Sequence, residues 1–287
     1  RNGFDYRQPI YLNLAPNYDA TLNPRLMTER GVQLGAQFRY LVEGGQGVVE
    51  GTWMPDDKLR DRDRSLLRYD AFQNISSHWQ ARANLNWISD SRYYEDFSNS
   101  LDGLSQTSAY SAIGVYGRGQ GWDAGVTADH WQLADFTLTE EALPFSRLPR
   151  AYLNWEQRLA GLLLGGIGAE AVRFEHEAYD AGSRIDLKPW ISLPLEGNSW
   201  FLRPTAAYRY TGYSLDRGLA QALGGSSPSR GQSIFSLDAG LFFDRDTTVK
   251  GRRLLPPPEP PRSGRHPPPP LPRGPPVPDP PILPPRP

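Results

Sequence analysis

The sequence lacks cysteine, a charge excess of either sign and any long apolar run. Without cysteine in 287 residues, the chain holds no disulfide and no thiolate metal site. Its 31 Lys and Arg against 32 Asp and Glu give a net charge of -1, so nucleic acid is not an expected partner. The longest apolar run, residues 159–169, is glycine-rich and shorter than the roughly 18 residues of a membrane helix.

The low mean hydropathy, -0.56, does not exclude a membrane protein. In a transmembrane β-barrel only every second residue faces lipid, so the chain as a whole stays polar. The chain begins at Arg1, and no charged segment followed by an apolar one marks a leader peptide. We expect that the sequence starts inside a longer protein.

The dominant pattern from residue 10 to residue 243 is alternation of apolar and polar side chains. In residues 79–87, tryptophan, alanine and leucine alternate with Gln80, Arg82, Asn84 and Asn86. A period of two is typical of a strand with one apolar and one polar face. Similar segments recur at residues 32–40, 122–128, 202–210 and 235–243. We expect about 12 strands in all, with Trp79, Ala81, Ala83, Leu85 and Trp87 facing lipid and the polar set facing the lumen.

The lengths of these segments and of their connections favour a membrane barrel over a soluble β-sandwich. Ordinary strands run about 5–6 residues, whereas spanning strands need about 9–11. Short turns are expected at residues 43–47, 117–120 and 196–198, and long polar loops near 55–65, 89–106, 134–148 and 213–230. Short turns on one rim and long loops on the other are typical of outer-membrane barrels.

Aromatic residues gather near the expected strand ends. The tryptophans at these ends and the Tyr93–Tyr94 pair are interpreted as girdles at the membrane interface; the tryptophans are Trp53, Trp79, Trp87, Trp122, Trp131 and Trp200. The alternative is that they are core aromatics of a β-sandwich. The length of the strands argues against it.

The last 32 residues, 256–287, contain 18 of the chain's 28 prolines. Proline has no N–H to donate to a strand ladder, so the barrel pattern ends by residue 255. We therefore divide the chain into a barrel segment, residues 1–255, and a proline-rich tail, residues 256–287, expected to be disordered. The tail is interpreted as non-native, and the alternative is a polyproline II ligand for a partner domain.

Several ordered blocks resemble the LptD family of lipopolysaccharide-assembly proteins, also called organic solvent tolerance proteins. The first block is YLNLAPNYDATLNPR at residues 11–25, and others follow at Gly31 with residues 38–41, and at residues 54–57, 88–97, 243–248 and 251–254. The resemblance covers about 245 residues and is specific because the blocks keep their order. It implies an all-β, antiparallel transmembrane barrel.

The resemblance also implies function, location and partners. Family members carry a periplasmic domain before these blocks and many more strands after them, so we expect this chain to be the first part of such a barrel. The resemblance implies a translocon in the outer membrane of a Gram-negative bacterium. This translocon is plugged by a lipoprotein of the LptE type, receives lipopolysaccharide from a periplasmic bridge of the LptA type and contacts outer-membrane lipids. It releases lipopolysaccharide through a lateral gate between its first and last strands.

Three prolines suggest where such a gate would lie. Pro9, Pro16 and Pro24 fall in the first strand region, where each removes one ladder N–H and weakens pairing. The alternative is that they are ordinary turn or edge residues. The polar residues of the same region, Asn13, Asn17, Asp19 and Thr21, are expected to point into the lumen, where ordinary solvation would explain them equally well.

Signs of chemistry are weak. The histidines at 78, 130 and 176 are scattered, and no serine stands at a nucleophile-elbow spacing, so an outer-membrane esterase or phospholipase is a minor alternative, as is a general porin. Neighbouring strand residues point to opposite faces, which argues against a metal site at Glu175-His176-Glu177. Residues 56–64 are expected to form a self-neutralising, solvated loop, with cation-mediated contact to lipopolysaccharide as an alternative. No catalytic residue, metal or cofactor is predicted.

Overall fold

The computed structural model describes residues 2–97, 106–216, 218, 220–221, 225–242, 247–249 and 252–254. The proline-rich tail lies outside these residues. Within them, no helix is long and apolar enough to cross a membrane.

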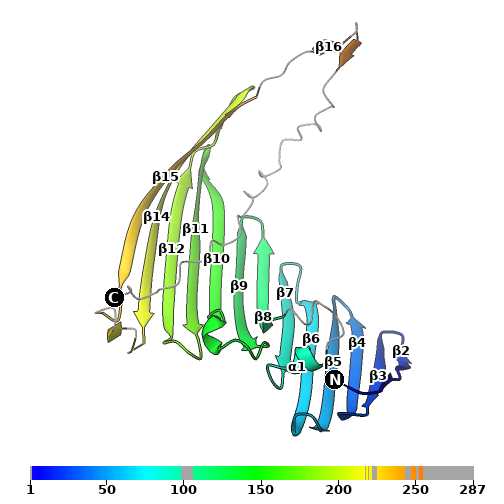
Figure 1. The fold of residues 1–287 in the computed structure, drawn as a ribbon. Helices are drawn as coiled ribbons and strands as arrows, with labels where there is room; N and C mark the ends of the chain where they lie inside the picture. The colour runs from blue at the N-terminus through cyan, green and yellow to red at the C-terminus, as the bar shows by residue number, and fades with distance from the viewer. Residues whose placement is uncertain are drawn as a thin grey trace.

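One antiparallel sheet of fifteen strands dominates the described chain (Figure 1). A short helix, α1 (Tyr93–Phe97), and a 3₁₀ turn, η1 (Glu140–Ala142), lie in two of the connections, and a separate hairpin pairs β16 (Thr247–Val249) with β17 (Arg252–Leu254). The strands of the large sheet are β1 (Asp5–Arg7), β2 (Ile10–Ala15), β3 (Tyr18–Met27), β4 (Gly31–Val42), β5 (Gly45–Asp57), β6 (Arg62–Asn74), β7 (Trp79–Ile88), β8 (Ser108–Gly119), β9 (Trp122–Leu133), β10 (Ser146–Ala160), β11 (Leu163–Glu175), β12 (Gly182–Ser192), β13 (Leu195–Glu196), β14 (Trp200–Leu215) and β15 (Ser229–Leu241).

Twelve of these described strands, β3 to β12 with β14 and β15, are ten residues or longer. The prediction of about 12 long antiparallel strands is therefore confirmed. Each long strand pairs with the next along the chain, so the sheet is a meander. The sheet is a single layer and is not closed: β1 and β2 form one edge and β15 forms the other (Figure 1).

The register aligns the apolar positions of successive strands on one face. Leu22 pairs with Ala36, Ala36 with Gly51, and Gly51 with Leu67 across β3 to β6. Cross-strand partners share a face, so the alternation found in single strands becomes one continuous apolar surface. It continues through Trp87, Ile113, Val126, Leu153, Ile167, Leu187, Tyr210 and Phe235.

Strand β7 shows both faces. Trp79, Ala81, Ala83, Leu85 and Trp87 lie on the apolar face, and the alternating polar residues lie on the other face. Trp79 and Trp87 are 37% and 50% exposed, so neither is buried in a dry core. The soluble-sandwich alternative would need that core, and the single layer does not provide it. That the apolar face meets lipid stays a prediction.

The connections follow the predicted two-rim plan with one correction. On one rim, turns at residues 16–17, 43–44, 120–121 and 161–162 join neighbouring strands, and Gly44 and Gly121 supply the positive φ that such tight turns need. On the other rim, the connections at residues 89–107, 134–145 and 216–228 are long. The predicted loop at 55–65 is wrong, because β5 and β6 extend into it and leave only residues 58–61 as the connection.

Candidate functional site at the first sheet edge

The edge strand is interrupted at Gln8 and Pro9, between β1 and β2. Both strands pair with β3 in one register, Arg7 opposite Arg25 and Ile10 opposite Leu22. The two-residue gap therefore faces Asn23 and Pro24 of β3. Two prolines thus stand almost opposite each other, at the place where the ladder is broken.

The alternation of hydrogen bonds shows which way each missing donor points. The amide of Thr28 donates to the Phe4 carbonyl over 3.1 Å, and the amide of Gln8 donates to the Pro24 carbonyl over 3.1 Å. In an antiparallel pair, hydrogen-bonded and non-hydrogen-bonded pairs alternate. The even-numbered residues of the edge strand thus face β3, and the backbone of Pro9 faces away from β3, toward the open edge.

The three predicted gate prolines therefore occupy three different positions. Pro24 lies in β3, and its missing N–H deprives the Gln8 carbonyl of a return bond inside the sheet. Pro9 removes a donor from the open edge itself. Pro16 lies in the turn between β2 and β3, next to a register shift between Asn13 and Ala15. Of the three prolines, only Pro9 removes a hydrogen-bond donor that points toward a strand beyond the open edge. This distinction can be made only once the strand register is known.

The predicted lumen-facing residues lie close together on the polar side. Asn13 pairs with Asp19, and the Asp19 carboxylate accepts two 2.8 Å hydrogen bonds from Arg39 and one of 3.3 Å from the Tyr11 hydroxyl. Thr21, two residues from Asp19 in β3, shares this face. Asn17 lies in the turn, where its side-chain amide donates to the Leu41 carbonyl over 3.2 Å. A recess of about 430 Å³ includes Asn13, Asn17, Asp19 and Arg39 in its lining.

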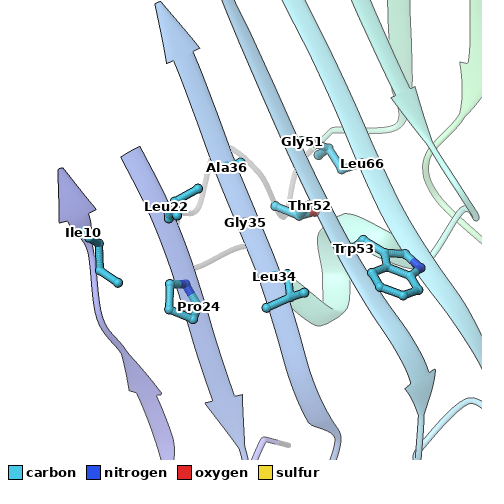
Figure 2. A pocket seen from close by; sticks show the side chains of 10 residues that line it. All are labelled: Ile10, Leu22, Pro24, Leu34, Gly35, Ala36, Gly51, Thr52, Trp53 and Leu66. Atoms are coloured by element: carbon cyan, nitrogen blue, oxygen red, sulfur yellow. The ribbon is translucent and has the colours of Figure 1, made fainter. Parts of the chain in front are cut away.

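The apolar face carries a second recess at the same edge, of about 500 Å³. Figure 2 shows Ile10, Leu22, Leu34 and Trp53 around it, contributed by β2 to β5. Ala36 and Gly51, which pair directly, lie between these larger side chains. Because both residues are small, the space above them stays open. All four large side chains are 40–49% exposed, so the recess is an open apolar surface beside the broken ladder.

Next to the edge, the long-connection rim contains a buried ion-pair network that the sequence interpretation missed. Arg64 and Asp57 are fully buried, and Arg30 is 2% exposed. Arg30 donates to Asp57 and Asp96 over 2.7 Å each, and Arg64 donates to Asp96 and Asp90 over 2.5 and 2.8 Å. The interpretation of residues 56–64 as a solvated loop is therefore wrong for Asp57 and Arg64, which are buried in this network, whereas most of the other charged residues of the segment are exposed.

Helix α1 covers the polar face at this rim. The Tyr93 hydroxyl accepts a 3.1 Å hydrogen bond from Gln33 and also contacts the Thr52 hydroxyl, while Tyr94 donates to Asn86 over 2.8 Å. Tyr93 and Tyr94 are 3% and 4% exposed, which corrects their interpretation as interface girdle residues. They are buried together with Phe97 over an apolar patch of the sheet made of Met27, Met54, Leu66 and Ile88.

Asp96 is the acidic centre of the network. Burial alone would raise the pKa of this carboxyl, but hydrogen bonds from Arg60, Arg64 and Arg30 outweigh it and hold the pKa well below the ordinary 3.8. The guanidinium of Arg64 also lies 4.7 Å from the centre of the Phe97 ring, a cation–π contact. Asp96 is therefore ionised at neutral pH, which keeps α1 attached by charge as well as by packing.

The histidines are engaged in local contacts. His78 Nδ1 lies 2.8 Å from Ser77 Oγ, and His130 Nδ1 lies 3.2 Å from Ser146 Oγ. Both ring nitrogens of His176 bond to backbone, to the Leu143 carbonyl and the Ala178 amide. In the described part of the chain, no group of three acidic or imidazole ligands could hold a metal.

The sequence of this chain matches one protein family and several curated proteins of that family. The LptD family model, described as LPS transport system D, matches residues 62–257. The LPS-assembly protein LptD of Xanthomonas euvesicatoria pv. vesicatoria is 49% identical over 288 residues, an alignment that covers 89% of this chain and 36% of that protein. The protein of the same name from Xylella fastidiosa strain Temecula1 is 47% identical over 277 residues, covering 89% and 35%. The chain thus spans about a third of the length of these relatives, and it belongs to the LptD family.

Proposed function

We propose that this chain forms part of the wall of a larger outer-membrane barrel that delivers lipopolysaccharide to the outer leaflet of a Gram-negative outer membrane. The curated relatives are named LPS-assembly proteins. In this proposal the edge formed by β1 and β2 is one side of a lateral opening, through which lipopolysaccharide passes from the lumen into the membrane.

One observation carries the proposal: the open edge lacks a backbone donor at Pro9. An unpaired backbone group inside hydrocarbon costs several kcal/mol, so a fully bonded seam rarely opens. A seam that already lacks one hydrogen-bond donor loses fewer hydrogen bonds when it opens. Pro24, opposite Gln8 in β3, also lacks an N–H, so the Gln8 carbonyl receives no hydrogen bond from it. The pairing of the edge strand with β3 is therefore weakened next to Pro9.

The two recesses at this edge fit the chemistry of an amphipathic lipid. The apolar recess, between Leu22 and Trp53, offers contact to acyl chains. The polar recess, with Asn13, Asn17 and Asp70, offers hydrogen-bond donors and acceptors to sugar hydroxyls. A general porin needs neither recess at a strand edge, so their arrangement favours lipid release over solute diffusion.

The partners in this proposal are a plug lipoprotein of the LptE type inside the barrel and a periplasmic bridge of the LptA type that supplies lipopolysaccharide. Both follow from the family resemblance. The polar face is the surface available to a plug, since it carries the charged pairs Arg150–Glu170 and Arg209–Asp186 along β10 to β14. Outer-membrane lipids would cover the apolar face.

The proposal is tested by restoring the missing donors in the full-length protein. Pro9→Ala is expected to strengthen pairing across the opening by about 0.5–1.5 kcal/mol if the facing carbonyl is in register. Pro24→Ala is expected to strengthen the pairing of Gln8 with β3 by a similar amount. Opening becomes rarer in both variants. We expect slower arrival of newly made lipopolysaccharide at the cell surface and greater sensitivity to bulky antibiotics, with the barrel still folded.

Pro204→Ala is the matched control. The Leu193 amide donates to the Pro204 carbonyl over 3.0 Å, as the Gln8 amide does to Pro24, but Pro204 lies in β14, at the opposite end of the sheet from β1 and β2. This variant should gain the same kind of bond without changing delivery. Normal delivery in Pro9→Ala and Pro24→Ala, with a defect in Pro204→Ala, would reject the edge as the opening.

A further inference from the structure

The edge strand is held unequally on the two sides of Pro9. On the β1 side, backbone and side chains of residues 2–7 bond to β3 and to the connection that follows it. The Phe4 amide donates to the Thr28 hydroxyl over 3.0 Å, in addition to the backbone bond between the same residues. Asp5 accepts two hydrogen bonds from Arg25, of 2.8 and 2.5 Å.

These bonds lead directly into the buried network. Arg30 donates to the Asn2 side-chain oxygen over 2.9 Å while its two terminal nitrogens bond to Asp57 and Asp96. Arg25 is only 2% exposed, so its guanidinium cannot exchange Asp5 for water without a rearrangement. Arg25 thus ties β1 to β3, and Arg30 ties Asn2, just before β1, to α1 and to the end of β5.

The β2 side has no comparable attachment among the described residues. The residues of both segments, Asp5 to Arg7 and Ile10 to Leu14, are exposed, so the difference lies in their side-chain bonds. In the described part of the chain, residues 10–14 make one side-chain hydrogen bond, the 3.3 Å contact from the Tyr11 hydroxyl to Asp19. β2 is therefore held to the sheet mainly by its backbone ladder, on the far side of an interruption that carries a proline on each strand.

We propose that Arg25 and Arg30 are positioning residues that clamp β1, so that Pro9 acts as a hinge and opening is confined to β2. The inference rests on the proposed function and adds which part of the edge strand moves when the barrel wall opens. α1 and its ion pairs then form the fixed support of the opening. If the clamp is lost, opening extends from β2 into β1, and the backbone hydrogen bonds between β2 and β3 do not change.

Hydrogen–deuterium exchange on the full-length protein in lipid nanodiscs tests this division. In the unaltered protein we expect the amides of residues 4–8 to exchange roughly tenfold or more slowly than those of residues 10–14, because bonds to charged groups must break before β1 opens. Asp5→Asn should remove most of that difference and leave residues 10–14 unchanged. Asp5→Glu, which keeps the charge, should restore the slow exchange.

Asp19→Asn is the matched control, because it also removes one carboxylate from a doubly bonded arginine pair, at the β2 side. It should leave residues 4–8 protected. Asn2→Ala gives a second test that spares every buried charge, and it should speed exchange of residues 4–8 alone. Equal exchange of the two segments in the unaltered protein, or an Asp5→Asn effect spread over both, would overturn the clamp. Delivery of lipopolysaccharide, measured in parallel on Pro9→Ala, tests the proposed function separately.

Discussion

Replacing Arg64 with alanine is expected to detach α1 from the sheet and to destabilise the fold by about 3–5 kcal/mol, because it takes one shared cation away from three closely spaced, buried carboxylates. Arg64 is fully buried and bonds to three aspartates, Asp57, Asp90 and Asp96. The expected signs are a lower denaturant midpoint and rapid proteolysis near residues 89–97. Both are measured on the full-length protein in detergent or nanodiscs.

Arg39→Ala is the control for this prediction. Arg39 also makes a doubly bonded aspartate pair, but its side chain is 51% exposed and solvent can replace Asp19. Little change in the denaturant midpoint is expected. If Arg64→Ala is tolerated as well as Arg39→Ala, the network does not hold α1, and the clamp on β1 loses its support.

The second large effect is expected from placing a charge on the apolar face. Ala83 lies midway between Trp79 and Trp87 in β7, on the apolar face. Ala83→Arg should destabilise the folded barrel in a bilayer by about 2–4 kcal/mol, the cost of a cation near the middle of the hydrocarbon. The measurement is the free energy of unfolding in lipid vesicles, or the yield of folded protein in the outer membrane.

The neighbouring residue provides the control. Asn84 points to the polar face, where its amide donates to Asp70 over 3.0 Å. Asn84→Arg should be nearly neutral because an arginine there meets water and a carboxylate. Equal costs for the two substitutions, or a larger cost at Asn84, would mean that the apolar face does not meet lipid.

The fold could be predicted from the sequence to this extent because its main signal is local. Alternation in residues such as Trp79 to Trp87 depends only on successive side chains of a strand pointing to opposite faces. Turn glycines such as Gly44 and Gly121 are also local signals. The predicted number of strands and the predicted plan of the connections therefore agree with the structure, apart from residues 55–65.

The candidate site was only partly predictable, because it depends on register and on packing between distant segments. The orientation of the missing donors at Pro9 and Pro24 is fixed by which residues pair across the ladder, which no single-strand pattern contains. Asp57 and Arg64 look solvated in sequence because their neighbours are charged; α1, some thirty residues later, buries them. The signal that could have found this is the spacing of Tyr93, Asp96 and Phe97, which lie within about one helical turn, with Asp90 three residues before Tyr93.

The most direct test of lipid release at the edge is the order in which newly made lipopolysaccharide meets different parts of the wall. Photo-crosslinking side chains are placed at Leu12 in β2 and at Ile113 in β8, both exposed on the apolar face, in the full-length protein in growing cells. After a short pulse of labelled precursor, crosslinks to labelled lipopolysaccharide should appear first at Leu12 and reach Ile113 only later, as the lipid spreads in the membrane. Simultaneous crosslinks, or earlier ones at Ile113, would contradict release through the β2 edge.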